Sequence, residues 1–159
     1  MRFLACILFS ITMILSGFVD AQQVQQKQDD ILSGPLNDPE LSTFRELVRG
    51  TGVYDLFQDT GPFTAFAPSN AAFAKLSLAQ LEELKKDKDR LTTILLYHVL
   101  PGKYMSQFIK PENVRTLNGK TVNLNKQGNT ITVNQAKVIR ADLVGPNGVV
   151  HIIDAVLAP

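Results

Sequence analysis

The stretch "VVHIIDAVL", residues 149–157, decides the fold of this chain. With the two-residue alternation of a strand, one face carries Val149, His151, Ile153 and Leu157, and the other carries Val150, Ile152, Asp154 and Val156. Both faces are mostly apolar, which is typical of a central strand that is covered on both sides. A buried polar group without a hydrogen-bond partner costs roughly 1–3 kcal/mol. We therefore predict that His151, Asp154 or both are partly buried and hydrogen-bonded.

More short strands precede this stretch. The segments 116–125, "TLNGKTVNLN", and 129–134, "NTITVN", alternate β-branched and polar residues. Turn residues follow or interrupt them, at Asn118-Gly119 and at residues 127–129, and "GPNG" at 145–148 comes directly before the last strand. The C-terminal part of the chain is thus predicted to be a series of β-strands.

The part before residue 111 has mainly helical signals. We predict helices over 38–50, 53–58, 70–76, 77–88 and 90–100, and one buried strand over 62–68. The expected N-caps are Asp38 or its neighbour, Ser69 or Asn70, and Ser77, which has capping-box spacing to Gln80. Pro101-Gly102 is expected to end the last helix. Helices followed by strands describe an α+β domain.

The first residues are typical of an export signal. Arg2 supplies a positive charge, residues 3–19 are almost entirely apolar, and Val19-Asp20-Ala21 suits a cleavage site. An uncleaved signal anchor is the alternative. We predict a signal peptide over 1–21, a flexible polar leader over 22–35 and one domain over 36–159. The expected location is secreted or extracellular, or periplasmic or cell-surface if the source is bacterial.

Composition narrows the classes of function. The only cysteine, Cys6, lies in the predicted signal, so the mature domain is expected to have no disulfide and no thiolate chemistry. The formal net charge is +1 with both signs interspersed, which disfavours nucleic acid as the main partner. No second long apolar run follows the signal, so no transmembrane segment is expected after cleavage.

The residues give little support for catalysis. The two histidines, His98 and His151, lie far apart, and neither belongs to a metal-binding pair such as His-x-x-x-His. The nucleophile motif Gly-x-Ser-x-Gly is absent, and no glycine loop precedes a helix to hold a phosphate. A pair of facing carboxylates is left open by the sequence. We predict no enzyme activity, no cofactor and no metal site, and a structural role for His98 at the end of its helix.

Three blocks carry a family resemblance: "TGPFTAFAPSNAAF" at 60–73, "LLYHVLPGKY" at 95–104 and "NGVVHIIDAVLAP" at 147–159. In order and spacing they resemble the signature blocks of the fasciclin (FAS1) domain, and the resemblance covers one complete copy. It implies a wedge-shaped β-sandwich with helices packed along one side. It also implies an extracellular role in adhesion through protein contacts, without catalysis or cofactor. Within these blocks, Asn70, His151 and Asp154 are expected to be structural.

Two places in animal members are linked to integrin binding. The first, the Tyr-His block, corresponds here to Tyr97 and His98 with the aliphatic residues around them. The second, an Asp-Ile pair, corresponds to Asp142 and Leu143, where leucine replaces isoleucine and the preceding residues depart from the animal pattern. The resemblance therefore makes Asp142, Leu143, Tyr97 and His98 the candidate adhesion residues. From the residues alone, Asp142 could instead cap the turn that follows it.

The sequence leads to two functional hypotheses. The first is a secreted module for cell adhesion or matrix association, whose partner is a cell-surface receptor, integrin-like or other, or a matrix protein. The alternative is a secreted binder of a small or polymeric ligand, such as a polysaccharide or a lipid. Because adhesion gains strength from linked copies, an oligomer is possible under the first hypothesis.

Overall fold

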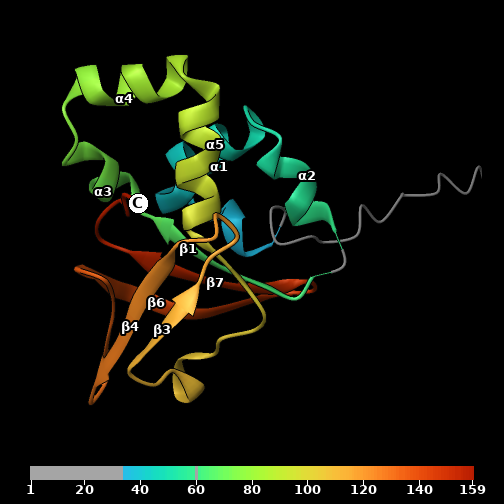
Figure 1. Cartoon of the computed structure of the whole chain (residues 1–159), viewed down its shortest axis with the longest axis vertical. Coiled ribbons are helices and arrows are strands. Elements are labelled where there is room, and N and C mark those ends of the chain that lie inside the picture. Colours follow the sequence, from blue (N-terminus) through green and yellow to red (C-terminus); the bar gives the residue numbers. More distant parts are fainter. Residues whose placement is uncertain (1–33, 60) are drawn as a thin grey trace, which may run out of the picture.

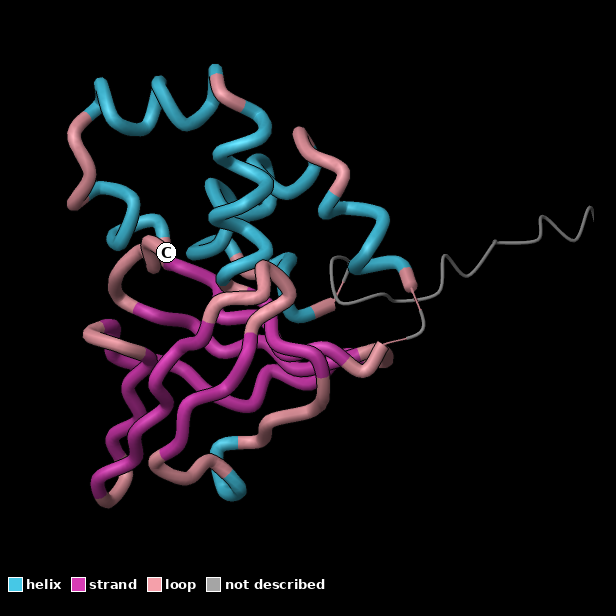
Figure 2. Tube along the Cα trace, in the orientation of Figure 1, coloured by secondary structure: helices cyan, strands magenta, loops and turns pink. Residues whose placement is uncertain are grey.

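The computed structural model of the chain describes residues 34–59 and 61–159. The predicted signal peptide, its cleavage site, Cys6 and leader residues 22–33 lie outside the described residues. Helices gather on one side of the molecule and strands on the other (Figures 1 and 2). This arrangement confirms the predicted α+β class with helices along one side of the sheet.

Most of the helical side comes from residues before His98. Its elements are η1 (Pro35–Asn37), η2 (Pro39–Leu41), α1 (Ser42–Arg49), α2 (Val53–Gln58), α3 (Asn70–Ala74), α4 (Leu78–Lys86) and α5 (Lys88–Tyr97). One more 3₁₀ turn, η3 (Ser106–Phe108), lies apart from these helices, below the sheet in Figure 1. α4 has the predicted capping box, in which the Ser77 hydroxyl accepts from Gln80 N–H and the Gln80 side chain accepts from Ser77 N–H.

Seven strands form one sheet in the order β2-β1-β7-β6-β5-β4-β3. They are β1 (Phe63–Pro68), β2 (Val99–Pro101), β3 (Glu112–Arg115), β4 (Thr121–Gln127), β5 (Thr130–Val133), β6 (Ala136–Gly145) and β7 (Gly148–Ile153). β7 pairs with β1 in parallel and with β6 antiparallel, and all six of its residues are buried. The prediction of a central strand covered on both faces is confirmed.

β6 joins the two halves of the sheet, which are β2-β1-β7 on one side of it and β5-β4-β3 on the other. Its first residues pair with β5 and its later residues pair with β7, with register shifts between Val138 and Arg140 and between Arg140 and Leu143. Such irregularities bend a strand and increase its twist. The sheet is therefore continuous, while its two halves face each other as the layers of a sandwich do.

Two apolar cores follow from this geometry. The first lies between the helices and the sheet and includes Phe44, Phe57, Leu95 and Val150. The second lies between the two halves of the sheet and joins Phe66, Leu100 and Ile153 of one half to Val122, Leu124 and Ile131 of the other. Both faces of β7 are thus buried because each one contacts a different core.

Three predicted boundaries are wrong in detail. The helix expected over 38–50 begins as one 3₁₀ turn, η2, and its α-helical part starts at Ser42. The helix expected over 90–100 begins at Lys88 and ends at Tyr97, and residues 99–101 form β2 because they pair with β1 and bury Val99 and Leu100. The last strand ends at Ile153, where the Asp154 N–H donates to the Lys137 carbonyl outside the β7 ladder.

Candidate functional site

The Tyr-His block lies at the junction of α5 and β2. His98 is the C-cap of α5, and its ring is 1% exposed. Its Nδ1 lies 2.8 Å from the Ile94 carbonyl, and its Nε2 accepts from the Leu157 N–H at 2.9 Å. These bonds assign the neutral tautomer with the proton on Nδ1. Burial lowers the pKa of His98 to about 4, against the bond to Ile94, which raises it.

Tyr97 is buried in the second core. Its hydroxyl donates to the Thr121 carbonyl and accepts from the Asn134 side-chain amide, both at 3.1 Å. Asn134 has a positive φ of 53° and bonds to Asn123 through its side chain and its backbone. Tyr97 therefore connects α5 to the sheet half formed by β3, β4 and β5.

The aliphatic residues of the same block are also inside the protein. Leu95, Val99 and Leu100 are buried, and Leu96 is partly buried against the first core. The side chains of Tyr97 and His98 hold elements together and do not reach a partner at the surface. An adhesive role for them stays a prediction that would require the block to open.

His151 on β7, like His98, bonds to two separate backbone segments through its two ring nitrogens. Its Nε2 lies 2.6 Å from the Tyr104 carbonyl, and its Nδ1 accepts from the Asp142 N–H at 3.2 Å. The ring is fully buried and stacks on Phe66 with 5.4 Å between ring centroids. These bonds require the proton on Nε2, the reverse of the tautomer in His98. Burial lowers the pKa of His151, although the Tyr104 carbonyl and the Asp142 carboxylate oppose it.

Asp142 lies within β6, in the irregular region between Arg140 and Leu143, and not at the turn. Its backbone has a positive φ of 60°, a conformation that aspartate tolerates better than most residues. Its carboxylate accepts from the Ser106 N–H at 2.7 Å and from the Ser106 hydroxyl. Both oxygens of this candidate adhesion residue are therefore bonded to η3, and the carboxylate does not cap the turn that follows.

The electrostatics of Asp142 agree with this internal role. Burial raises the pKa of its carboxyl, but the two bonds from Ser106 and the nearby Lys126 ammonium outweigh burial and hold that pKa below its usual value. Lys126 itself donates to the Ser106 carbonyl at 2.8 Å. Leu143, the candidate adhesion residue beside it, is partly buried and packs against the first core.

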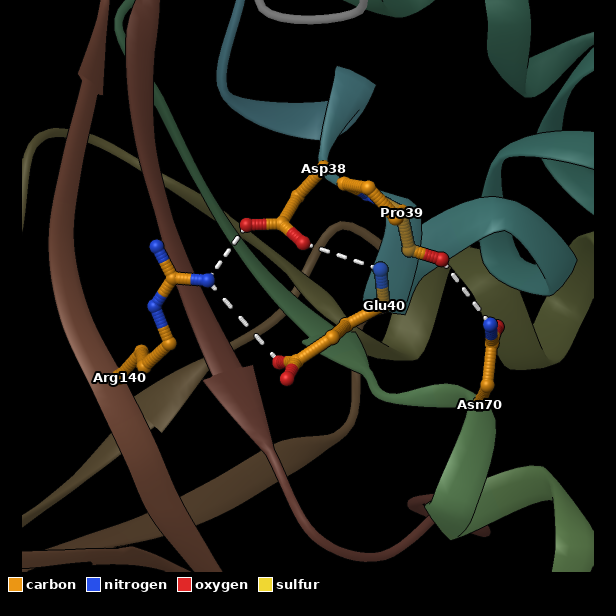
Figure 3. A network of polar contacts seen from close by, with 5 residues as sticks. All are labelled: Asp38, Pro39, Glu40, Asn70 and Arg140. Atoms are coloured by element: carbon orange, nitrogen blue, oxygen red, sulfur yellow. Dashed lines mark hydrogen bonds and ion pairs between the residues drawn. The ribbon is translucent and has the colours of Figure 1, made fainter.

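Asn70, at the first position of α3, supplies the cap that α1 lacks. Leu41 precedes α1 without a side-chain bond, while the Asn70 side-chain oxygen accepts from the Thr43 N–H at 3.1 Å. The Asn70 amide also donates to the Pro39 carbonyl at 3.0 Å, as Figure 3 shows. Helix N-termini leave backbone donors without partners, so this contact stabilises α1 from another element. The N-cap of α3 itself is Ser69.

Arg140 and Asp154 also connect elements that are distant in the sequence. Arg140 of β6 contacts Asp38 and lies 3.9 Å from Glu40 (Figure 3), which connects the sheet to η2. Asp154 accepts from the Lys137 N–H at 2.8 Å, and its carbonyl accepts from the Lys75 ammonium at 2.7 Å. Every expected structural residue, Asn70, His151 and Asp154, thus makes long-range contacts.

Two exposed apolar residues close to Asp142 were not singled out from the sequence. Phe108 is 66% exposed at the end of η3, two residues after Ser106. Val144 is 52% exposed on β6, two residues after Asp142. Ser106 and Asp142 bond directly, so the segment that carries Phe108 is attached to β6. We call the exposed part of η3 around Phe108 the Phe108 surface. No sequence signal marks Phe108, since "KYMSQFIK" has no clear strand or helix period.

Within residues 34–59 and 61–159, no cluster of three or more histidine, cysteine, aspartate or glutamate side chains is arranged to hold a metal ion. In the same part of the chain, none of the helices combines the length and the apolar character needed to cross a bilayer.

The comparisons with known proteins agree with this architecture. The model of the Fasciclin domain matches residues 39–159. The chain belongs to the fasciclin family. It is 36% identical over 141 residues to immunogenic protein MPT70 of Mycobacterium tuberculosis, covering 83% of this chain and 70% of that protein. It is 38% identical over 120 residues to protein sll1483 of a Synechocystis strain, covering 74% of this chain and 67% of the relative.

Two other similarities place the fasciclin domain in longer proteins. Human periostin is 32% identical over 125 residues, which is 77% of this chain but only 15% of periostin. The FAS1 domain pair of the insect cell adhesion molecule fasciclin I has the same fold, with a TM-score of 0.65 and 20% identity over 82% of this chain and 51% of that one. Fasciclin domains are non-catalytic binding modules, in agreement with the predicted lack of enzyme activity.

Asp142→Ala is expected to lower the free energy of unfolding by about 2 kcal/mol. Alanine loses the two bonds from Ser106 and is strained in a left-handed backbone, and each effect is worth about 1 kcal/mol. Asp142→Asn keeps an acceptor and tolerates the positive φ, so its loss should be less than half as large. Urea unfolding of both variants measures the difference, and equal losses would contradict a contribution from the backbone conformation.

Proposed function

We propose that this fasciclin domain is an extracellular adhesion module that binds a protein partner through the Phe108 surface. The family is associated with cell-surface and adhesion proteins, and a relative 35% identical to this chain is named cell surface glycolipoprotein MPB83. The observation that carries the proposal is the two-thirds exposed Phe108 on a segment that is pinned to the sheet.

The pinning of η3 makes Phe108 suitable as an anchor. Ser106 is held from two sides, by the Asp142 carboxylate and by the Lys126 ammonium. The Phe108 N–H donates to the Met105 carbonyl at 2.9 Å, which closes the 3₁₀ turn. Binding through a side chain on an already ordered segment costs less conformational entropy than binding through a mobile loop. Buried aromatic anchors also contribute strongly to protein interfaces.

The charges around this surface suggest the chemistry of the partner. Lys103 and Lys110 are exposed on either side of η3 in the sequence. Acidic side chains bordering an apolar pocket would therefore complement Phe108, because opposite charges steer association and select partners. An integrin-like receptor that uses a metal ion to bind Asp142 would first have to displace Ser106 from the carboxylate. A partner that binds Phe108 requires no such change.

Phe108→Ala is expected to weaken attachment to cells or matrix about tenfold, the effect of removing a modest interface hot spot. The melting temperature should hardly change, since exposed substitutions usually alter stability by less than about 0.5 kcal/mol. Attachment of the full chain to coated surfaces, measured over a concentration series, gives the ratio.

Leu78→Ala is the matched control. Leu78 is also large and apolar, is 81% exposed, and lies on α4 at the helical side. Attachment should be unchanged in this variant. If the two substitutions weaken attachment equally, contact through general surface hydrophobicity explains the result and the Phe108 surface is not the site.

A further inference from the structure

The sheet half made of β3, β4 and β5 has an outer face that no element covers in the described part of the chain. Its inner residues Val114, Val122, Leu124, Ile131 and Val133 are buried in the second core. The residues that alternate with them point the other way. They are Asn113, Thr121, Asn123, Asn125, Thr130 and Thr132, and all six are exposed or half-buried. We call this set the outer face.

The outer face consists of amides and hydroxyls in register. Asn113 lies opposite Asn123, and Asn125 lies opposite Thr132. Neighbouring strands are about 5 Å apart and successive outward side chains of one strand about 7 Å apart. The face therefore presents donors and acceptors on a regular grid, which suits an extended polymer with many hydroxyl groups.

Part of this grid is already ordered. The Asn123 side-chain amide donates to the Asn113 side-chain oxygen at 2.9 Å, and the Asn123 N–H donates to the Asn134 side-chain oxygen at 2.8 Å. The Asn113 amide nitrogen and the Asn123 side-chain oxygen lie on an exposed surface, where they can bond to a ligand. Side chains fixed before binding lose less entropy when a ligand arrives.

Two positively charged side chains lie at the edges of the outer face. Arg115 continues β3 on the same face, and Lys137 of β6 lies opposite Thr132. Residues 102–159 contain seven Lys or Arg and three Asp or Glu, a net charge of +4, whereas residues 34–101 contain seven and nine, a net charge of −2. Two of the seven cations, Lys126 and Arg140, are bonded to Ser106 and Asp38 and do not serve the outer face. Of the three acids, Asp142 and Asp154 are bonded to other groups, and Glu112 alternates with Asn113. The outer face thus favours an acidic ligand.

We propose that the outer face binds a polyuronate, an acidic polysaccharide whose charges are carboxylates. The guanidinium of Arg115 matches a carboxylate with two parallel bonds, and Lys137 supplies a second charge. A more densely charged polymer would need more than these two cations. A single-stranded nucleic acid would need aromatic side chains for base stacking, and the six residues of the face include none.

Affinity electrophoresis of the full chain tests this proposal. Polygalacturonate in the gel should retard the protein, and neutral dextran should not. Asn125→Asp is nearly isosteric and places a negative charge in the centre of the face, so it should weaken retardation at least fivefold. Arg115→Gln with Lys137→Gln should do the same. Unchanged melting temperatures would show that both variants are folded.

Lys86→Gln with Lys88→Gln is the control, because it removes the same charge from exposed positions on the helical side. It should leave retardation unchanged. The proposal is overturned if polygalacturonate gives no retardation, or if the control variant weakens it as much as the outer-face variants do. It is also overturned if a single-stranded oligonucleotide binds more tightly and loses binding with the same outer-face substitutions.

Discussion

His98→Ala is expected to lower the free energy of unfolding by about 3 kcal/mol at pH 7, which combines a cavity with two unpaired backbone groups. The substitution leaves the Ile94 carbonyl at the end of α5 and the Leu157 N–H without their imidazole partner. Both groups are far from free water, because the ring that bonds them is 1% exposed. Urea unfolding followed by circular dichroism measures the loss.

His98→Asn serves as the comparison for this prediction. Its shorter side chain can still donate to the Ile94 carbonyl but does not reach across to Leu157, so we expect an intermediate loss. A loss below about 1 kcal/mol for His98→Ala would show that the two bonds and the packing of the ring contribute little, contrary to typical values for buried polar groups.

Acid should destabilise the wild-type protein more steeply than the His98 variants. The pKa of His98 is lowered from 6.5 to about 4 by burial. The folded state therefore holds the imidazole neutral, and its contribution is complete above pH 6.5. It is lost progressively as the pH falls towards 4 and is absent below that pH. This difference in the pKa of His98 between the unfolded and the folded state corresponds to about 3 kcal/mol of unfolding free energy.

Protonation of His98 destabilises the folded state because the neutral ring has its proton on Nδ1 and uses Nε2 as an acceptor. A proton added to Nε2 would face the Leu157 N–H and remove its acceptor, while the buried ring would carry a charge. His151, whose pKa is also lowered by burial, adds to the acid sensitivity of the wild type and of the variants alike. The stability advantage of the wild type over His98→Asn should therefore fall by about 3 kcal/mol from pH 7 to pH 4, which exceeds the intermediate loss expected at pH 7 and makes the variant the more stable protein near pH 4. Parallel curves for the two proteins would show that protonation of His98 does not cause the acid sensitivity.

The two histidines explain why the signature blocks of this fasciclin domain lie inside it. His98 connects α5 to the segment after β7, and His151 connects β7 to Tyr104 and β6. Each ring donates from one nitrogen and accepts at the other, so each joins two backbone segments. The candidate adhesion residues Tyr97, His98 and Asp142 are bonded between these elements, whereas Phe108 is exposed.

The sequence by itself determined the elements whose signals are local. The alternation in residues 149–157 predicted a central strand, and β7 is one, although it stops at Ile153. The spacing of Ser77 and Gln80 predicted the start of α4. Capping and alternation act between residues a few positions apart, so their physical basis is contained in short stretches of the chain.

Only the tertiary structure decided the surroundings of the candidate residues. The Leu157 N–H that meets His98 is 59 positions away, and the Ser106 group that binds Asp142 is 36 positions away. The Asn70 oxygen caps α1 across 27 positions, and residues 99–101 became a strand because β1 lies beside them. These contacts depend on where the chain folds back, and no local pattern encodes that. The sequence could therefore mark Tyr97, His98 and Asp142 as important, but their burial and bonding arise from packing between distant segments.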